Sequence, residues 1–312
     1  MRPEGCRLVR STRKATLTHC TRLVKQFGQQ ESWQEAVGIA REMRGMTIEP
    51  DLIAYSALVS ACEKGHQWSH ALHLSAEMRK ALIQPDLIVY SSLTSACEKG
   101  QRWQQALALH AELQQEGLRP NAISYSAAIS ACGRGQQWPQ AFQLLADMRQ
   151  RGVKPDVITY SAVITACEKG QLWVQPMQLL AEMRQGDLRP NVITYSTLLS
   201  CFEKGHQWER ALSVLAELPR RRLRPNTVTY NASISACEKG NLWAHSMHLL
   251  SQMRQDAVAP TAITYNATIS ACEKGEQWLR SLALLAEMRQ RNLSPTIVTY
   301  NASISACEKG RE

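Results

Sequence analysis

The sequence lacks two features that mark large classes of proteins. No uninterrupted apolar stretch approaches the roughly 18 residues that a membrane-spanning helix requires, so the pattern of a membrane protein is missing. No Cys-x-x-Cys pair occurs either, although the chain contains 10 cysteines. Cysteines at that spacing are typical of structural zinc sites and thiol redox centres, and their absence argues against both.

The cysteines recur instead at a fixed spacing along the chain. Stacked helices lie about 8–10 Å apart, whereas a disulfide requires Cα atoms within about 7 Å. We therefore expect small buried thiols in a reducing compartment, without disulfides or metal. Seven of them hold equivalent positions, namely Cys62, Cys97, Cys132, Cys167, Cys237, Cys272 and Cys307.

Charge is distributed unevenly. The formal net charge of +9 indicates attraction to a polyanion. Residues 1–16 combine Ser and Thr with basic side chains and a single acidic one, Glu4. They are predicted to form a basic N-terminal tail or part of an organelle transit segment. Their cations are Arg2, Arg7, Arg10, Arg13 and Lys14.

A repeat of 35 residues runs along almost the whole chain, and every tryptophan follows it. A fixed period of this length predicts a stack of small supersecondary units in place of one globular core. We expect one buried register for all the tryptophans, which favours a role in packing over one as stacking platforms for a ligand. The tryptophans are Trp33, Trp68, Trp103, Trp138, Trp173, Trp208, Trp243 and Trp278.

One repeat, residues 52–86, predicts two short helices. A first helix over 52–64 ends at Gly65, the residue type usual just beyond a helix C-terminus. A second helix over about 68–80 carries apolar residues at helical spacing, and Pro85 blocks its continuation. Two helices and tight turns in every unit indicate an all-α chain, an αα-solenoid.

The first helix of this repeat has two distinct faces. Tyr55, Leu58, Val59 and Cys62 lie within about 100° on a helical wheel and predict the buried face. The opposite face carries a stripe of an aliphatic residue, two small polar residues and a cation: Ile53, Ser56, Ser60 and Lys64.

This stripe recurs in the later repeats. One interpretation is contact between neighbouring repeats. The other is a ligand surface, with an apolar wedge for a flat ring, a polar group for its edge and a cation for phosphate. Single-stranded nucleic acid offers all three features in every nucleotide.

These residues resemble the pentatricopeptide repeat family of organellar RNA-binding proteins. The match covers residues 17–312 and rests on the 35-residue period, the Ile-Thr-Tyr-like opening and the Pro-Asp or Pro-Asn close of each repeat. The resemblance implies a right-handed αα-solenoid, or superhelix, that binds single-stranded RNA. The repeats are 17–51, 52–86, 87–121, 122–156, 157–191, 192–226, 227–261 and 262–296, with a partial one at 297–312.

The resemblance implies that each repeat reads one base through its fifth and its last residue. Asp accepts only and suits the ring N–H of G or U, whereas Asn suits A or C. In the family, Ser or Thr at the fifth position goes with purines and Asn with pyrimidines. The predicted site is 5′-GGAGAAYY-3′, with the N-terminus at the 5′ end. The pairs, in order, are Thr21 with Asp51, Ser56 with Asp86, Ser91 with Asn121, Ser126 with Asp156, Ser161 with Asn191, Ser196 with Asn226, Asn231 with Thr261 and Asn266 with Thr296; Asn301 is the fifth residue of the partial repeat.

Two further sets of residues follow from the same resemblance. The second residues would separate neighbouring bases as wedges, and the cations of the stripe would contact phosphate. The wedges are Ile53, Ile88, Ile123, Ile158, Ile193, Val228, Ile263 and Val298. The cations are Lys64, Lys99, Arg134, Lys169, Lys204, Lys239, Lys274 and Lys309.

Some positions depart from the pattern. The first repeat has Thr18 at the wedge and Gln29 at the cation position, which indicates a degenerate cap. Phe202 replaces the usual cysteine, and Pro176 is expected to bend a second helix. Arg220, Arg221, Arg222 and Arg224 form a basic turn that either adds phosphate affinity or is only solvated.

No enzyme activity is expected. Neither the His-x-Glu and Cys-x-x-Cys set of a zinc deaminase nor the clustered aspartates of a nuclease occurs, and no metal or cofactor is predicted. His70/His73 and His245/His248 have helical spacing but no third ligand, which favours solvated surface.

Two functions remain open. The chain is either an RNA-binding adaptor of a mitochondrion or chloroplast or a protein-interaction scaffold that uses a helical groove. The stripe favours RNA. A lone first helix at 297–312 would leave its apolar face uncovered, which indicates a piece of a longer array or a chain completed by a partner.

Overall fold

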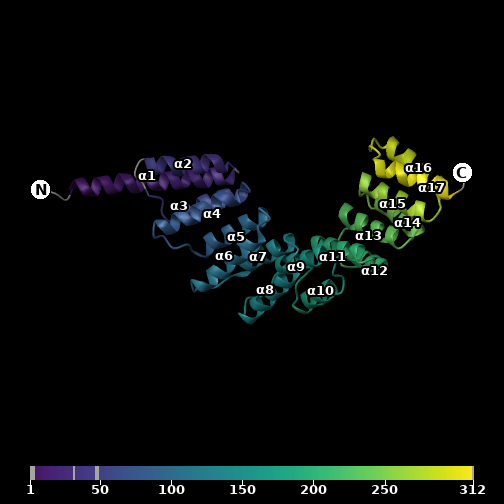
Figure 1. The fold of residues 1–312 in the computed structure, drawn as a ribbon, viewed down its shortest axis with the longest axis horizontal. Coiled ribbons are helices and arrows are strands. Elements are labelled where there is room, and N and C mark those ends of the chain that lie inside the picture. The colour runs from purple at the N-terminus through teal and green to yellow at the C-terminus, as the bar shows by residue number, and fades with distance from the viewer. Residues whose placement is uncertain (1–3, 31, 46–48, 311–312) are drawn as a thin grey trace. The chain divides into compact units, whose positions relative to one another are not determined.

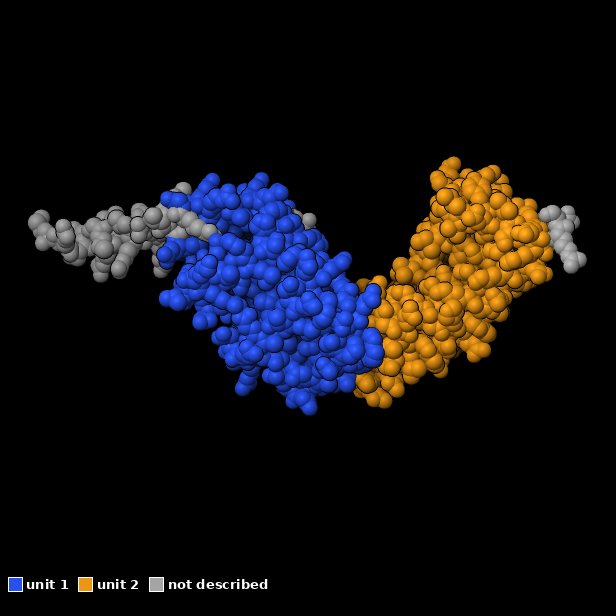
Figure 2. Space-filling view, in the orientation of Figure 1, with its two compact units in different colours: residues 1–155 blue, residues 156–312 orange. Residues whose placement is uncertain are grey.

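The computed structural model describes residues 4–30, 32–45 and 49–310, with side chains from residue 17 onward except residue 44. Over these residues it contains helices and short connections and no strand. None of the described helices is both long and apolar enough to span a membrane. The chain divides into two compact units, residues 1–155 and 156–312 (Figure 2).

The first compact unit contains four pairs of antiparallel helices, which follow one another in chain order (Figure 1). The helices are α1 Glu4–Gln29, α2 Trp33–Gly45, α3 Leu52–Lys64, α4 Trp68–Lys80, α5 Leu87–Lys99, α6 Trp103–Gln115, α7 Ala122–Arg134 and α8 Trp138–Gln150. Within this unit, α1, α3, α5 and α7 pack against one another in succession, and α3, α5 and α7 each contact both even-numbered neighbours.

The second compact unit repeats this arrangement and ends on a single helix. Its odd-numbered helices again form one continuous layer. The helices are α9 Val157–Lys169, α10 Gln175–Gln185, α11 Val192–Lys204, α12 Trp208–Arg220, α13 Thr227–Lys239, α14 Trp243–Gln255, α15 Ala262–Lys274, α16 Trp278–Gln290 and α17 Ile297–Lys309. The predicted αα-solenoid of paired helices is therefore confirmed.

Local sequence explains these boundaries. The predicted helices 52–64 and 68–80 coincide with α3 and α4. At the start of α3, Asp51 accepts the N–H of Ala54 at 2.8 Å; at its end, the N–H of Gly65 donates to the carbonyl of Ala61. A capped start and a turn at the end satisfy backbone groups that a short helix leaves unpaired.

The predicted bend of a second helix at Pro176 is wrong, because the proline shifts the start of the helix instead. Helix α10 begins at Gln175, whereas every other described second helix of the later repeats begins at its tryptophan. Pro176 lies in the first turn of α10, where its missing N–H costs no hydrogen bond. The proline therefore delays the helix start past Trp173 and produces no interior bend.

The core consists of a narrow apolar seam in each repeat. Tyr90, Leu93 and Cys97 of α5 are no more than 1% exposed. Burial raises the pKa of the Cys62 and Cys97 thiols to about 11, so both remain protonated. All described cysteines are free, as expected. Cys307, in the last helix, is half-buried and departs from the expectation for its position.

The tryptophans are half-buried, and Trp138 is 36% exposed, so the buried register predicted for them is wrong. Several of them do pack, against the next repeat. The indole of Trp68 lies so close to Gly100 of the next repeat that a Cβ there would be 2.3 Å from Cδ1. The φ angle of Gly100 is −78°, so close approach, and not a left-handed backbone, requires the glycine. The same contact joins Trp33 to Gly65 and Trp243 to Gly275.

Several non-glycine turn residues have a left-handed backbone, and Leu82 is one of them. Leu82 has φ = +58° and is 91% exposed, whereas its equivalent in the next repeat is Gly117, with φ = +73°. A left-handed non-glycine residue costs about 1–2 kcal/mol, partly offset by the higher unfolded-state entropy of glycine. We expect Leu82→Gly to raise the free energy of unfolding by about 0.5–1 kcal/mol in urea titrations. Gly117→Ala, which meets open space, should lower it by a similar amount; equal stability of both variants and the parent would contradict this.

Candidate nucleic-acid interface

The predicted wedge residues project from one face of the first helices. Their exposed fractions run from 54% at Val228 to 68% at Ile123 and Ile158, although each is a large aliphatic side chain. On the odd-numbered helices from α3 to α15 the opposite, tyrosine-bearing face is buried, whereas in α17 Tyr300 is exposed and Cys307 is half-buried. Within each compact unit, exposure of an aliphatic residue at the same position of consecutive repeats leaves an apolar row that makes no core contact.

A hollow of about 410 Å³ opens on this face in the first compact unit. Ile53 and Ile88, the wedges of two consecutive repeats, both line it, together with Ser56 and Asp86. These last two are the predicted base-reading pair of repeat 52–86. Lys64 lines the same hollow. One recess therefore brings together two wedges, one reading pair and a cation.

The last residue of each repeat is also the N-cap of the following helix. Asp86 accepts the N–H of Val89 at 2.9 Å, and Oδ1 of Asn121 accepts the N–H of Ser124 at 2.9 Å. This role was not among the predictions, although an Asx residue directly before a helix is a known N-cap signal. The same bond is made by Asp51 to Ala54, Asp156 to Thr159, Asn191 to Thr194 and Asn226 to Thr229.

Capping fixes what each residue presents to a ligand. An amide NH₂ cannot accept a hydrogen bond, so Asn121 must turn Oδ1 to the helix and Nδ2 away from it. Asp86 in the same place turns its second carboxylate oxygen outward. Repeats closed by Asn therefore present donors, and repeats closed by Asp present an acceptor.

The fifth residues lie beside these caps in the second compact unit. Nδ2 of Asn231 is 3.4 Å from Oγ1 of Thr261, the last residue of its own repeat. Oδ1 of Asn231 accepts the hydroxyl of Thr264 at 2.6 Å. Asn266 contacts Thr296 and Thr299 in the same way. Two predicted reading pairs are thus in contact, with their amides held by the protein.

The serine and threonine side chains at the fifth position are all buried or half-buried. Thr21, Ser126 and Ser196 are buried, and Ser56, Ser91 and Ser161 are half-buried. The hydroxyl of Ser91 donates to the carbonyl of Leu87 at 2.7 Å, and Ser196 donates to Val192 in the same way. The free lone pairs of such a hydroxyl can accept a hydrogen bond. Asn301 is exposed.

Most cations of the stripe are ion-paired. Lys99 lies 3.3 Å from Glu63 of the preceding repeat, and Lys204 lies 2.8 Å from Glu168. Ser95 also donates to Glu63, at 2.8 Å. The other pairs are Arg134–Glu98, Lys239–Glu203, Lys274–Glu238 and Lys309–Glu273. Part of the stripe therefore makes contacts between neighbouring repeats, which was one of its two interpretations.

Two cations of the stripe stand apart. In the other repeats the cation pairs with a Glu that lies 36 residues earlier in the chain. That position is occupied by Gly28 for Lys64 and by Gly133 for Lys169. Across the described part of the chain, no carboxylate pairs with Lys64 or Lys169, and both are exposed. Thr18 and Gln29 of the first repeat are also exposed, so that repeat has neither the aliphatic wedge nor the cation.

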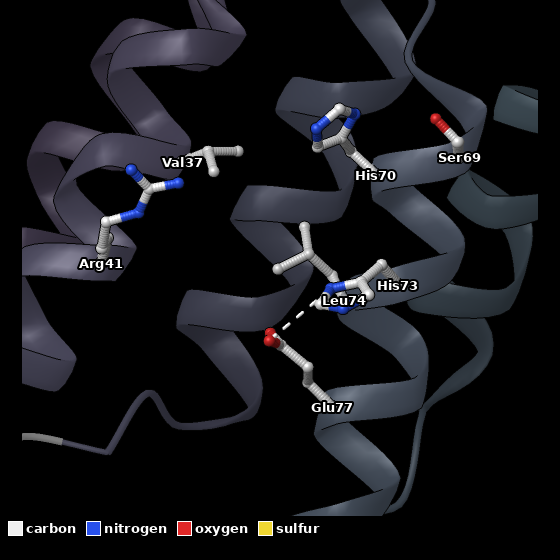
Figure 3. Close-up of a pocket in the computed structure, with 7 residues that line it drawn as sticks. All are labelled: Val37, Arg41, Ser69, His70, His73, Leu74 and Glu77. Atoms are coloured by element: carbon white, nitrogen blue, oxygen red, sulfur yellow. Dashed lines mark ion pairs between the residues drawn. The ribbon is translucent and has the colours of Figure 1, made fainter.

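The paired histidines lie on second helices, outside this face. Figure 3 shows His70 and His73 on α4 opposite Arg41 of α2, around a hollow of about 420 Å³. Nδ1 of His73 is 3.6 Å from Glu77, and the His70 ring lies 5.0 Å from that of Trp33. No group of three potential metal ligands occurs among the residues with described positions.

Comparison with known families identifies the repeats. The sequence model described as "Pentatricopeptide repeat domain" matches residues 38–100, 73–135 and 178–240. The one described as "PPR repeat family" matches residues 127–169, 225–274 and 260–309. No curated protein sequence matches the chain.

Solved structures share the fold. The pentatricopeptide repeat protein PPR10 in complex with an 18-nucleotide psaJ RNA element has a TM-score of 0.81 at 21% identity, over 98% of this chain and 45% of that one. The pentatricopeptide repeat protein PPR10 from maize, in another crystal structure, has a TM-score of 0.68 at 27% identity, over 99% of this chain and 44% of that one. The PPR domain of Arabidopsis thaliana protein-only RNase P 1 in complex with tRNA has a TM-score of 0.51 at 13% identity, over 59% and 95%. The chain spans less than half the length of PPR10.

Proposed function

Because this chain belongs to the pentatricopeptide repeat family, we propose that its first-helix face binds single-stranded RNA, one base to each repeat. The observation that carries the proposal is the hollow in which Ile53 and Ile88 flank Ser56 and Asp86. A base seated there would stack against aliphatic side chains and meet polar groups at its edge. PPR10, of the same fold, forms a complex with an RNA element.

Each repeat would distinguish bases through its capping residue. The outward oxygen of Asp86 would accept the N1–H of G or the N3–H of U. The outward amide of Asn121 would donate to N1 of A or N3 of C. The Ser or Thr at the fifth position goes with the purine in each case, and Asn with the pyrimidine.

The resulting site is 5′-GGAGAAYY-3′. Purines are assigned to the first six repeats and pyrimidines to repeats 227–261 and 262–296. In these two, the Asn231 and Asn266 amides are already held by threonines, and the last residue is Thr, so the reading is confined to pyrimidine over purine. The first repeat has a threonine wedge and no stripe cation, and therefore contributes least.

The role that fits these features is an adaptor without chemistry of its own. It would mask, stabilise or present an organellar transcript, in a mitochondrion or chloroplast, and recruit other factors. The alternative is a scaffold that binds peptides on the same face. A peptide would not need an aliphatic wedge beside a hydrogen-bonding pair in repeat after repeat, so RNA is favoured.

The unpaired stripe cation Lys64 provides a test. One phosphate contact on a single strand changes the salt slope of log K by about 0.7, or about fourfold in affinity at 0.15 M salt. We expect Lys64→Gln to weaken binding of 5′-GGAGAAUU-3′ by about fourfold in fluorescence anisotropy. The matched control, Glu63→Gln with Lys99→Gln, removes an ion pair without changing net charge and should leave affinity within twofold.

One outcome would extend the set of phosphate contacts, and another would overturn the proposal. If the control weakened binding as much as Lys64→Gln, the paired cations would contact phosphate as well. If the parent protein bound no single-stranded RNA at low salt but bound peptides, the scaffold would replace the RNA adaptor.

A further inference from the structure

A second set of cations lies outside the stripe. Four consecutive repeats carry Arg or Lys two residues before their last residue, in the sequence cation-Pro-Asx. All four side chains are exposed. They are Arg119 and Lys154 in the first compact unit and Arg189 and Arg224 in the second. We call these residues the edge cations.

The edge cations form no ion pair with any carboxylate of the described residues. No ion pair, hydrogen bond or ring contact engages any of their side chains within the described residues. The stripe cations of the same four repeats differ, since Lys99, Arg134 and Lys204 are paired with Glu of the preceding repeat. Paired cations contribute little net field, so the positive charge beside the first-helix face comes largely from unpaired groups.

The charge at this position is confined to the centre of the array. The equivalent residue is Glu49 or Gln84 in the earlier repeats and Ala259 or Ser294 in the later ones. A general requirement of the turn would apply to every repeat alike. The restriction to repeats 87–226 therefore indicates a role beyond folding.

The backbone places each edge cation beside a base-reading residue. Residues 118–121 have no regular structure, and a residue before proline adopts an extended conformation. Two extended residues span at most about 7 Å, so the Cα of Arg119 lies within that distance of the Cα of Asn121. A base held by Asn121 would bring its own backbone within reach of the long Arg119 side chain.

We propose that the edge cations bind the phosphates of the RNA strand, in addition to Lys64 and Lys169 of the stripe. This inference rests on the proposed function and names the groups that hold the backbone at the purines read by repeats 87–226. Arg and Lys at this position neutralise phosphate without regard to the base. The middle of the site then holds the strand most strongly.

The test compares double variants in which two cations of one compact unit are each replaced by an uncharged glutamine. Arg119→Gln with Lys154→Gln should weaken binding of 5′-GGAGAAUU-3′ by about 14-fold at 0.15 M salt, because two phosphate contacts together change the salt slope of log K by about 1.4. The magnitude of the salt slope should fall by about 1.4. A scrambled RNA should lose the same factor. The control, Arg41→Gln with Lys80→Gln, removes two exposed cations of second helices that have no ion pair with any described residue, and it should leave the slope unchanged.

A charge-conserving variant separates phosphate binding from folding. Arg119→Lys with Lys154→Arg should keep the parent slope, and circular dichroism should give the same unfolding curve for all variants. If the parent binds RNA and Arg119→Gln with Lys154→Gln leaves the slope unchanged, the edge cations do not contact phosphate, while the proposed function stands. If Arg41→Gln with Lys80→Gln lowers the salt slope equally, the loss of affinity comes from the net charge of the protein and the inference is wrong. A parent that binds neither RNA overturns the proposed function and this inference together.

Discussion

Asp86→Asn should change the base preferred at the second nucleotide of the site from G to A. Asn and Asp are equally good N-caps, so the bond to the Val89 N–H is kept and helix α5 is unaffected. What changes is the group that points outward, from a carboxylate oxygen to an amide NH₂. A carboxylate attracts the N1–H of G and repels the N1 lone pair of A; an amide donor reverses both.

The expected effect is large. Hydrogen bonds to a charged group contribute about 1.5–3 kcal/mol, which is roughly 10- to 100-fold in relative affinity. Anisotropy titrations with 5′-GGAGAAUU-3′ and 5′-GAAGAAUU-3′ measure this ratio for the parent and the variant. The RNA concentration series should be run at one fixed salt concentration, since affinity depends on salt.

The reciprocal variant is the control. Asn121→Asp keeps the cap on Ser124 and should change the preference at the third nucleotide from A to G. If the preferred base changes in opposite directions, at the second nucleotide for Asp86→Asn and at the third for Asn121→Asp, each repeat reads one base. If both variants lose affinity without changing preference, the last residues act as caps only, and the base assignment fails.

His110 should make the stability of the first compact unit depend on pH. Its side chain is 3% exposed and packs 4.7 Å from the ring of Tyr125. Gln114 donates to Nε2 at 3.2 Å, so Nδ1 carries the hydrogen, and within the described structure Nδ1 has no partner. Asp147 and Arg151 are the charged groups nearest this cluster.

Burial lowers the pKa of His110 from 6.5 to about 4, against a smaller opposing effect of Asp147. The unfolded chain therefore binds a proton below about pH 6.5 that the folded chain does not bind until about pH 4. The stabilising contribution is fully present above pH 6.5 and is lost as the pH falls towards 4. The difference corresponds to about 3 kcal/mol.

His110→Leu should remove this pH dependence. The equivalent residue of the next repeat is Leu145, which is buried, so leucine suits the position. Urea unfolding followed by circular dichroism at pH 7.5 and pH 4.5 should show a much smaller loss for the variant than for the parent. The variant should also be at least as stable at pH 7.5, because an unpaired buried N–H is removed. A parent and a variant that lose the same stability would show that His110 is not the group responsible.

Residues that act locally were predictable from the sequence. The bounds of α3 and α4 follow from Gly65, Pro85 and the apolar spacing, because each signal acts within one or two turns. The exposure of Ile53 and the burial of Cys62 follow from one helical wheel. Pro176 was placed correctly in a second helix, but the cost of an interior proline moved the start of α10 instead of bending it.

Residues that act between repeats were not predictable in this way. The pair formed by Lys99 and Glu63 joins positions 36 residues apart, and a wheel of one helix cannot show it. The Gly28 and Gly133 substitutions were visible, but their consequence for Lys64 and Lys169 required the packing. The capping role of Asp86 was within reach of the sequence. The buried, partly unpaired imidazole of His110 was not, since its environment comes from three helices.

The most direct measurement of the central claim is fluorescence anisotropy of the purified protein with 5′-GGAGAAUU-3′ and a scrambled RNA of the same composition, each at two salt concentrations. The account predicts tighter binding of the matched strand at both concentrations, with both affinities falling as salt rises. Equal affinities for the two strands would leave a basic, unselective RNA-binding surface and contradict base reading by the paired residues.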